Sequence, residues 1–320
     1  MPDLALAESS LASLVRPICS DLLKKLNYPS APQPSGEAVQ TLLEHMRSRA
    51  TGFGLSLDTS ISAKGFRLGH CLAVLAYPRY PLEVQGYVGL MTFLVVQYDD
   101  TVGQKGEMVH EAQLFHQRLF RGETQGNPLL QALAAMILEA YDHFDAMLAN
   151  MLQISILKFL TSNLMERHEG FQEMPITPAG SQFPTFYRDL SGMSIAYAIF
   201  CYPKRLYPDI SAFLEALPDM ARFTDISNDV LSFYKEEIGG DHRNYLHNRA
   251  KCTNIPLMTV LEEVKDETIE AAVRVDEILR GKPEYLQSWN QFVRGYVAMH
   301  TSNSRYKLME MGLGEGHPLP

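Results

Sequence analysis

The chain has 320 residues, of which 46% are hydrophobic and 20% are charged, and its formal net charge is -9. This composition supports a sizeable core, and the negative charge without a basic patch argues against a nucleic-acid partner. No apolar run approaches the roughly 20 residues that span a bilayer, and no signal peptide is recognisable. We therefore expect a cytoplasmic protein with no membrane span.

Almost every periodic segment predicts a helix, and strand-like alternation is absent. The predicted helices cover residues 4–27, 37–50, 66–77, 82–101, 106–121, 128–169 as two helices or one bent one, 185–200 with a break at Gly192, 210–238, 255–280 and 283–312. Residues 51–64 and 170–184 are predicted loops, and residues 310–320 are predicted to form a disordered tail. We expect one all-α domain over residues 1–320, with its helices around one core.

The cysteines and histidines show no spacing that is typical of a zinc site. Cys19, Cys71, Cys201 and Cys252 are far apart, and the chain has no CxxC motif and no paired histidines. We therefore expect thiols in a reducing compartment and no zinc site.

Three oxygen-bearing side chains lie at helical spacing in the predicted helix 210–238. Asn228, Ser232 and Glu236 are four residues apart, and each step of four advances the angle by only ~40° beyond a full turn. An amide, a hydroxyl and a carboxylate on one stripe suit Mg²⁺. A polar outer face is the alternative, but the apolar positions between them predict a largely buried helix: Val230, Leu231, Phe233 and Tyr234.

A second acidic element, Asp99-Asp100, ends the apolar helix 82–101. The helix dipole disfavours carboxylates at a helix C-terminus, so a bound cation would stabilise them there; an exposed helix end is the alternative. Two oxygen-rich elements on opposed helices can hold several Mg²⁺ ions and, through them, a diphosphate. Lys235, Arg188 and Arg305 are candidate donors to such an anion, although each by itself is more often a surface or ion-pair residue.

These residues resemble motifs of the class I terpene cyclases and, within them, of the fungal trichodiene synthase-like sesquiterpene cyclases. The run from Asn228 to Glu236 resembles the metal-binding triad of that family, and the segment from Phe292 to Arg305-Tyr306 resembles its C-terminal segment. The resemblance implies a class I terpenoid cyclase fold, often dimeric, with three Mg²⁺ ions and farnesyl diphosphate as substrate.

The resemblance also implies roles for individual residues. The metal ligands would be Asp99, Asn228, Ser232 and Glu236, with Asp100 as a supporting residue or further ligand; the diphosphate contacts would be Arg188, Lys235, Arg305 and Tyr306, and Gly192 would be the helix-break effector. One departure concerns the acidic motif, which in this family carries further acids after the pair. In this chain the pair is followed by Thr101-Val102-Gly103-Gln104, none of which is acidic.

The expected reaction is ionisation of the allylic diphosphate and cyclisation to a sesquiterpene hydrocarbon or alcohol, with release of diphosphate. The carbocation needs an apolar, aromatic-rich pocket that excludes water. Candidate pocket residues lie one or two turns from the motifs, although ordinary core packing is the alternative for each: Phe66, Thr92, Phe93, Val96, Met193, Ile195, Ala196, Thr224, Asp225 and Met299. Two other functions stay open, a prenyltransferase or head-to-head prenyl synthase, and an inactive helical binding protein.

Overall fold

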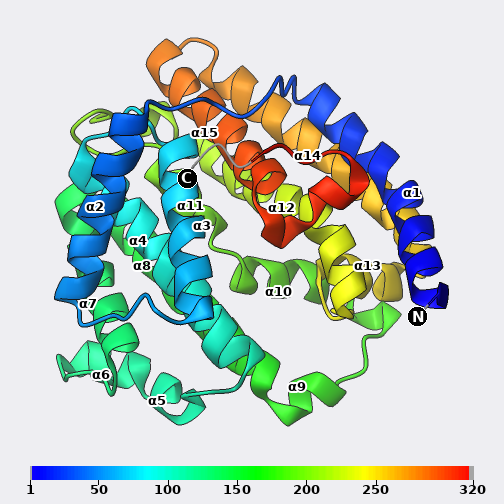
Figure 1. The fold of residues 1–320 in the computed structure, drawn as a ribbon, viewed down its shortest axis with the longest axis horizontal. Coiled ribbons are helices and arrows are strands. Elements are labelled where there is room, and N and C mark those ends of the chain that lie inside the picture. The colour runs from blue at the N-terminus through cyan, green and yellow to red at the C-terminus, as the bar shows by residue number, and fades with distance from the viewer. Residues whose placement is uncertain (1, 317–320) are drawn as a thin grey trace. The chain divides into compact units, whose positions relative to one another are not determined.

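A computed structural model describes residues 2–316, and every regular element in this range is a helix or a helical turn (Figure 1). The predicted all-α class is confirmed. The α-helices are α1 (Pro2–Lys25), α2 (Gly36–Gly52), α3 (Ser60–Ala76), α4 (Leu82–Tyr98), α5 (Val109–Gln113), α6 (Phe115–Arg121), α7 (Pro128–His143), α8 (Ala146–Arg167), α9 (Glu169–Glu173), α10 (Phe183–Ser191), α11 (Ser194–Phe200), α12 (Leu217–Gly239), α13 (Tyr245–Thr253), α14 (Leu257–Leu279) and α15 (Pro283–Ser302). The shorter turns are the π-helix η1 (Asp99–Gln104) and the 3-10 helices η2 (Pro178–Gly180), η3 (Ile210–Ala212), η4 (Leu214–Ala216), η5 (Ser304–Tyr306) and η6 (Leu308–Met311).

Contacts within the chain divide it into two compact units. The α12 unit comprises Met1–Gln33, Pro175–Asp189 and Ser211–Pro320, and the α4 unit comprises Pro34–Met174 and Leu190–Ile210. Asp99, Asp100 and Gly192 belong to the α4 unit, whereas the Asn228–Glu236 stripe and the predicted diphosphate donors belong to the α12 unit. The expectation of a single domain stays a prediction.

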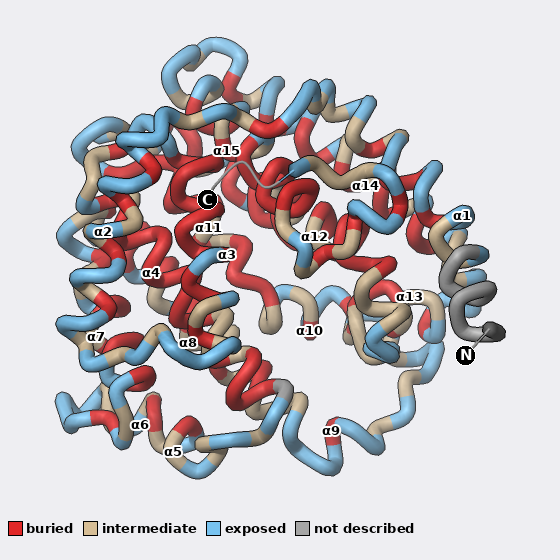
Figure 2. Tube along the Cα trace, viewed as in Figure 1, coloured by how far each residue is buried: buried red, intermediate tan, exposed pale blue. Residues whose placement is uncertain are grey.

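The centre of the α4 unit is α4 itself, which is buried along most of its length (Figure 2). A helix that is apolar all round is stable only inside a core, and α4 packs against α2, α3 and α7. The crossing with α3 is close, because a Cβ atom on Gly69 would lie 2.2 Å from the carbonyl oxygen of Gly89. The π-helix η1 continues α4 and packs against α8.

The α12 unit is built around α12, which packs against α1 and α14. Its buried side chains include Phe223, whose ring meets the edge of Trp289 of α15 at a centroid distance of 5.2 Å. Burial of each large apolar side chain stabilises the fold by roughly 1.5–3 kcal/mol. The helix therefore holds its polar side chains in a well-packed scaffold.

Two predicted helix starts are wrong for local reasons. The predicted helix 210–238 begins at Leu217 and not at 210, because Pro218 lacks the N–H that a continuing helix needs, and the preceding residues form the 3-10 turns η3 and η4. The helix α3 begins at Ser60, inside a predicted loop, because the Thr59 side chain caps it by accepting from the Ser62 N–H.

The C-terminal segment differs more from the prediction. The helix α15 ends at Ser302 because Asn303 is extended and accepts from the Arg305 N–H, which starts η5. Residues 310–316 are held in place where a disordered tail was expected: a Glu315 carboxylate oxygen accepts from the Ala31 N–H at 2.7 Å, and the Glu315 N–H donates to the Thr301 carbonyl oxygen at 2.8 Å. Residues 317–320 of the predicted tail lie outside the described residues.

Several other helix boundaries also differ between the prediction and the structure. Residues 128–169 form two helices, the helix 82–101 ends at Tyr98, residues 106–121 divide at Leu114, the predicted loop 170–184 contains α9 and the start of α10, and α13 was not predicted. The predicted break at Gly192 is confirmed, since it separates α10 from α11.

All four cysteines are buried thiols. In residues 2–316 no helix has both the length and the apolar character to cross a membrane.

Candidate active site

The oxygen stripe of α12 forms a connected group. The Ser232 hydroxyl donates to Oε1 of Glu236 at 2.6 Å, and Nδ2 of Asn244 donates to Oε2 of the same carboxylate at 3.0 Å. Ser232 is buried, whereas Asn228 and Glu236 are half-buried. The helix thus presents a carboxylate, a hydroxyl and an amide whose orientations are partly set by their neighbours.

The orientation of Asn228 is set by His300 of α15. The Nδ1 atom of His300 lies 2.8 Å from the Tyr296 carbonyl oxygen, which can only accept, so Nδ1 carries the proton. Burial lowers the pKa of His300 to about 4, so the ring is neutral and its Nε2 atom is an acceptor. Nε2 accepts from Nδ2 of Asn228 at 3.0 Å. The amide oxygen of Asn228 is then the atom left for a cation.

Arg188 of α10 is clamped to α12 by two carboxylates. Its Nε atom lies 2.9 Å from both carboxylate oxygens of Asp229, Nη1 lies 3.1 Å from Oδ1 of Asp225, and Nη2 donates to the Asp225 carbonyl oxygen at 2.8 Å. The Arg188 side chain is only 12% exposed. Burial opposes its charge, but the two carboxylates outweigh burial and raise the pKa of Arg188. These bonds use three of the five N–H donors of a guanidinium.

The other predicted diphosphate contacts also lie in the α12 unit. Lys235 is half-buried, with Nζ 3.6 Å from Oε1 of Glu236. The ring of Tyr306 packs on His300 at a centroid distance of 4.2 Å, so it adjoins the residue that orients Asn228. Arg305 lies in the same turn, η5, with a half-buried side chain.

The acidic pair Asp99-Asp100 lies in the α4 unit, at the start of the π-helix η1. Asp99 is half-buried and Asp100 is buried. A Cβ atom on Gly103 would lie 2.3 Å from Oδ1 of Asn163 and 3.3 Å from Oδ1 of Asp99, so a side chain at this position would displace the Asn163 amide where η1 meets α8. Single π turns inside or at the end of helices are frequent at functional sites.

The donor chemistry of both elements fits a hard divalent cation. In the α4 unit, Oδ1 of Asn163 is buried without a hydrogen-bond partner among the described residues, and it lies beside the same glycine as the Asp99 carboxylate. In the α12 unit the stripe offers amide, hydroxyl and carboxylate oxygens. Oxygen donors of these kinds are those that Mg²⁺ prefers.

The predicted pocket residues are divided between the two units. In the α4 unit the Phe66 ring meets the edge of Phe93 at 5.4 Å, and the Thr92 hydroxyl donates to the Val88 carbonyl oxygen. The others there are Val96, at the end of α4, and Met193, Ile195 and Ala196, at the start of α11. In the α12 unit Thr224 and Met299 are buried, and Asp225 is the ion-pair partner of Arg188. Their role as a pocket wall stays a prediction.

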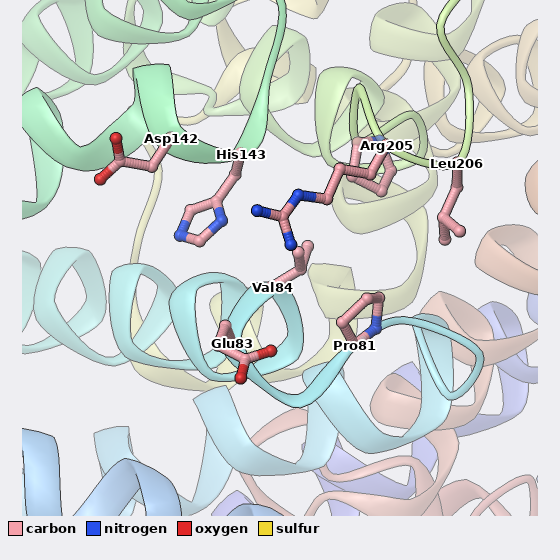
Figure 3. A pocket seen from close by; sticks show the side chains of 8 residues that line it. Pro81, Glu83, Val84, Asp142, His143, Arg205 and Leu206 are labelled. Carbon is pink, nitrogen blue, oxygen red and sulfur yellow. The ribbon is translucent and has the colours of Figure 1, made fainter.

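A small pocket of about 140 Å³ in the α4 unit contains none of the predicted site residues (Figure 3). It is lined by Pro81, Glu83, Val84, Asp142, His143, Pro203, Arg205 and Leu206. Ligand pockets typically measure ~300–1,000 Å³, so this one is too small for a prenyl diphosphate.

Comparison with known proteins identifies the family. The sequence profile of the trichodiene synthase family matches residues 60–315. The chain belongs to the trichodiene synthase family. Two relatives of this family member are longiborneol synthase CLM1 of Gibberella zeae, 32% identical over 96% of this chain and 91% of that protein, and terpene synthase BipA of Cochliobolus sativus, 32% identical over 91% and 88%.

A solved structure confirms the fold of this trichodiene synthase family member. It is linalool/nerolidol synthase from Streptomyces clavuligerus in complex with 2-fluorogeranyl diphosphate, with a TM-score of 0.64 and 12% identity over 83% of this chain and 99% of that chain. The predicted class I terpenoid cyclase fold is therefore confirmed. The family membership makes the protein a terpene cyclase and favours this activity over the prenyltransferase and the inactive binding protein. Class I enzymes of this kind use divalent metal ions and a prenyl diphosphate.

Sequence reasoning missed the partners that position the predicted residues. His300, Asp229 and Asn244 orient Asn228, Arg188 and Glu236, respectively. Only Asn244 had a local signal, because an asparagine before an apolar helical segment is typical of an N-cap, and its side chain caps α13. The contacts of His300 and Asp229 join residues 72 and 41 positions apart and have no local signal.

Proposed function

We propose that this terpene cyclase converts farnesyl diphosphate to a cyclic sesquiterpene hydrocarbon or alcohol and releases diphosphate, with three bound Mg²⁺ ions. The proposed metal ligands are Asp99, Asn228, Ser232 and Glu236, with Asp100 supporting. The proposed diphosphate contacts are Arg188, Lys235, Arg305 and Tyr306. A homodimer and a cytoplasmic location stay predictions.

The observation that carries the proposal is the hydrogen-bonded stripe on α12. Nε2 of His300 accepts a hydrogen bond from the Asn228 amide, and Ser232 donates to Glu236, so the ligand oxygens are held by a buried scaffold. Pre-oriented ligands of this kind reduce the reorganisation that metal binding requires. The bound 2-fluorogeranyl diphosphate of the Streptomyces enzyme supports an allylic diphosphate as the substrate class.

The chemistry follows from charge development on the leaving group. Bound Mg²⁺ would stabilise the negative charge that builds on diphosphate as the allylic C–O bond breaks. Lys235, Arg305 and Tyr306 would add hydrogen bonds to the same anion. Apolar and aromatic side chains would then hold the folded cation away from water until a proton is lost or water is admitted.

The direct test is incubation of the purified protein with Mg²⁺ and either farnesyl or geranyl diphosphate, followed by mass spectrometry of the volatile products. We expect C15 cyclic products from farnesyl diphosphate and no turnover after chelation of the metal. If only geranyl diphosphate were turned over, the substrate would be a C10 and not a C15 diphosphate. Turnover of neither substrate would contradict the proposal.

We expect His300→Phe to raise the Mg²⁺ concentration that half-saturates turnover by about 10–100-fold, because Asn228 loses the acceptor that orients it. The measurement is turnover of farnesyl diphosphate against Mg²⁺ concentration. The control is His70→Phe, which removes another buried histidine whose Nε2 contacts the Val39 carbonyl oxygen. The control should lower the melting temperature without changing the Mg²⁺ requirement. An equal Mg²⁺ requirement in both variants would mean that His300 is only a packing residue.

We expect Asp99→Ala to lower kcat more than Asp100→Ala does, because the half-buried Asp99 is the proposed ligand. Asp100→Ala should instead lower the melting temperature more, since Asp100 is only 8% exposed and its removal disturbs the packed π-helix. Steady-state kinetics and thermal melts of the metal-free variants separate the two effects. A larger loss of kcat in Asp100→Ala would reverse the ligand assignment.

A further inference from the structure

A second group of metal-ligating side chains lies across the connection from α12 to α13. Glu237 lies in the last turn of α12, His242 lies in the connection, and His247 lies in the first turn of α13. One ligand atom from each residue lies within 4.8 Å of the others. None of the three belongs to the proposed Mg²⁺ ligands, and all three lie in the α12 unit.

A chain of hydrogen bonds fixes the tautomer of His247. The Glu236 carboxylate can only accept, so the contact at 3.0 Å fixes Nδ2 of Asn244 as the atom that faces it. Oδ1 of Asn244 then faces Nδ1 of His247 at 3.0 Å, so Nδ1 carries the proton. Metal-bound histidines are typically held in this way, through a hydrogen bond from the ring nitrogen that does not bind the metal.

The other nitrogen of His247 faces the carboxylate of Glu237 without a hydrogen bond. Nε2 of His247 lies 3.2 Å from Oε1 of Glu237, yet this oxygen is buried and has no hydrogen-bond partner among the described residues. Burial, and after it the nearby charges of His242 and Lys251, together lower the pKa of His247 to about 4, although the Glu236 carboxylate opposes this shift. A lone pair and a carboxylate oxygen therefore face each other, an arrangement that a cation between them would stabilise.

We propose that Glu237, His242 and His247 form a site for a transition-metal ion of the Zn²⁺ class. Two imidazoles and one carboxylate with an open fourth position are a recurrent Zn²⁺ ligand set. Tetrahedral bonds of about 2.0–2.1 Å place ligand atoms roughly 3.3 Å apart, and the Glu237–His247 pair already has a separation of 3.2 Å. His242 is exposed in the connection, with its ring centroid 4.9 Å from that of His247. In the proposed site its side chain would rotate to bring a ring nitrogen to the ion.

This site adjoins the proposed catalytic stripe through one residue. Asn244 bonds both His247 and Glu236, so the same side chain orients a ligand of each site. The proposal differs from the sequence expectation of no zinc site, because the helix start at Tyr245 brings together residues that are five positions apart along the chain. The site goes beyond the proposed cyclase activity, and its test does not depend on turnover.

The test uses Co²⁺ as a spectroscopic substitute for Zn²⁺. The metal-free protein, with its thiols reduced, is titrated with Co²⁺ in excess Mg²⁺, which occupies oxygen-donor sites. Four-coordinate Co²⁺ with nitrogen ligands absorbs strongly in the visible range, whereas octahedral oxygen-coordinated Co²⁺ absorbs weakly. We expect one strongly absorbing Co²⁺ ion per chain and its complete displacement by one equivalent of Zn²⁺.

Three variants and a control assign the ligands. Glu237→Gln and His247→Ala should weaken Co²⁺ binding by about 100-fold or more, and His242→Ala by at least about 10-fold. The control is His110→Ala, whose side chain is 81% exposed and which should bind Co²⁺ as the wild type does. Because Glu237→Gln keeps the side-chain shape and His242 is exposed, these two variants should fold even if His247→Ala does not. Absence of the strong bands, or the same bands in Glu237→Gln and His242→Ala, overturns the site.

Discussion

We expect Asn228→Ala and Glu236→Ala each to lower kcat with farnesyl diphosphate by about 10³-fold or more, since each removes a proposed ligand of the ions that stabilise the leaving group. The metal-free proteins should lose little stability. Asn228 loses one hydrogen bond to His300, and Glu236 loses those from Ser232 and Asn244. Each such bond contributes about 0.5–1.5 kcal/mol to the free energy of unfolding. Steady-state kinetics and thermal melts after metal removal measure the two effects.

The control for the alanine variants is Glu270→Ala on α14, because the Glu270 side chain is 68% exposed and its only described ion pair is with Arg274 on the same helix. This variant should keep full turnover. Glu236→Asp gives a finer test, since it keeps a carboxylate in a displaced position, and a higher Mg²⁺ concentration should partly restore its turnover. A melting temperature that falls as steeply as kcat in Asn228→Ala or Glu236→Ala would show that the stripe is structural.

The parts of the fold and site that follow from periodicity could be predicted from sequence. The spacing of Asn228, Ser232 and Glu236 is a property of one helix, and Ser232 does contact Glu236 across one turn. The break at Gly192 and the buried helix that ends near Asp99 are likewise local features. Local stereochemistry sets these positions, so a single sequence is enough to find them.

The partners of those residues depend on packing and could not be predicted in this way. Asp229 is the neighbour of Asn228 in sequence, yet it faces Arg188, and this contact exists only because α10 packs on α12. Gly103, in the π-helix that begins at Asp99, similarly lies against Asn163 of α8, a distant part of the chain. A pattern of apolar and polar residues along one helix carries no information on which distant side chain completes a hydrogen bond.

Arg188 illustrates how this packing changes the expected result of a mutation. If Arg188 were only a diphosphate contact, its loss should affect only turnover. The structure places it between Asp225 and Asp229, with the Asp229 side chain 10% exposed and the Asp225 side chain 12% exposed. We therefore expect Arg188→Met to lower the free energy of unfolding by about 3–5 kcal/mol, because it leaves two buried carboxylates without their cation. Chemical denaturation measures this loss.

A combined variant separates the structural role of Arg188 from the proposed diphosphate contact. Adding Asp225→Asn and Asp229→Asn to Arg188→Met removes the uncompensated charges and should recover most of the lost stability, because neutral amides are less costly to bury. Arg274→Met is the matched control, since Arg274 also pairs with a carboxylate, Asp219, but is 47% exposed and should cost at most about 1 kcal/mol. If the combined variant is stable but does not turn over farnesyl diphosphate, while Asp225→Asn/Asp229→Asn with Arg188 intact does, Arg188 also acts on the substrate. If the combined variant turns over farnesyl diphosphate as the wild type does, Arg188 serves only to hold α10 against α12 through its ion pairs.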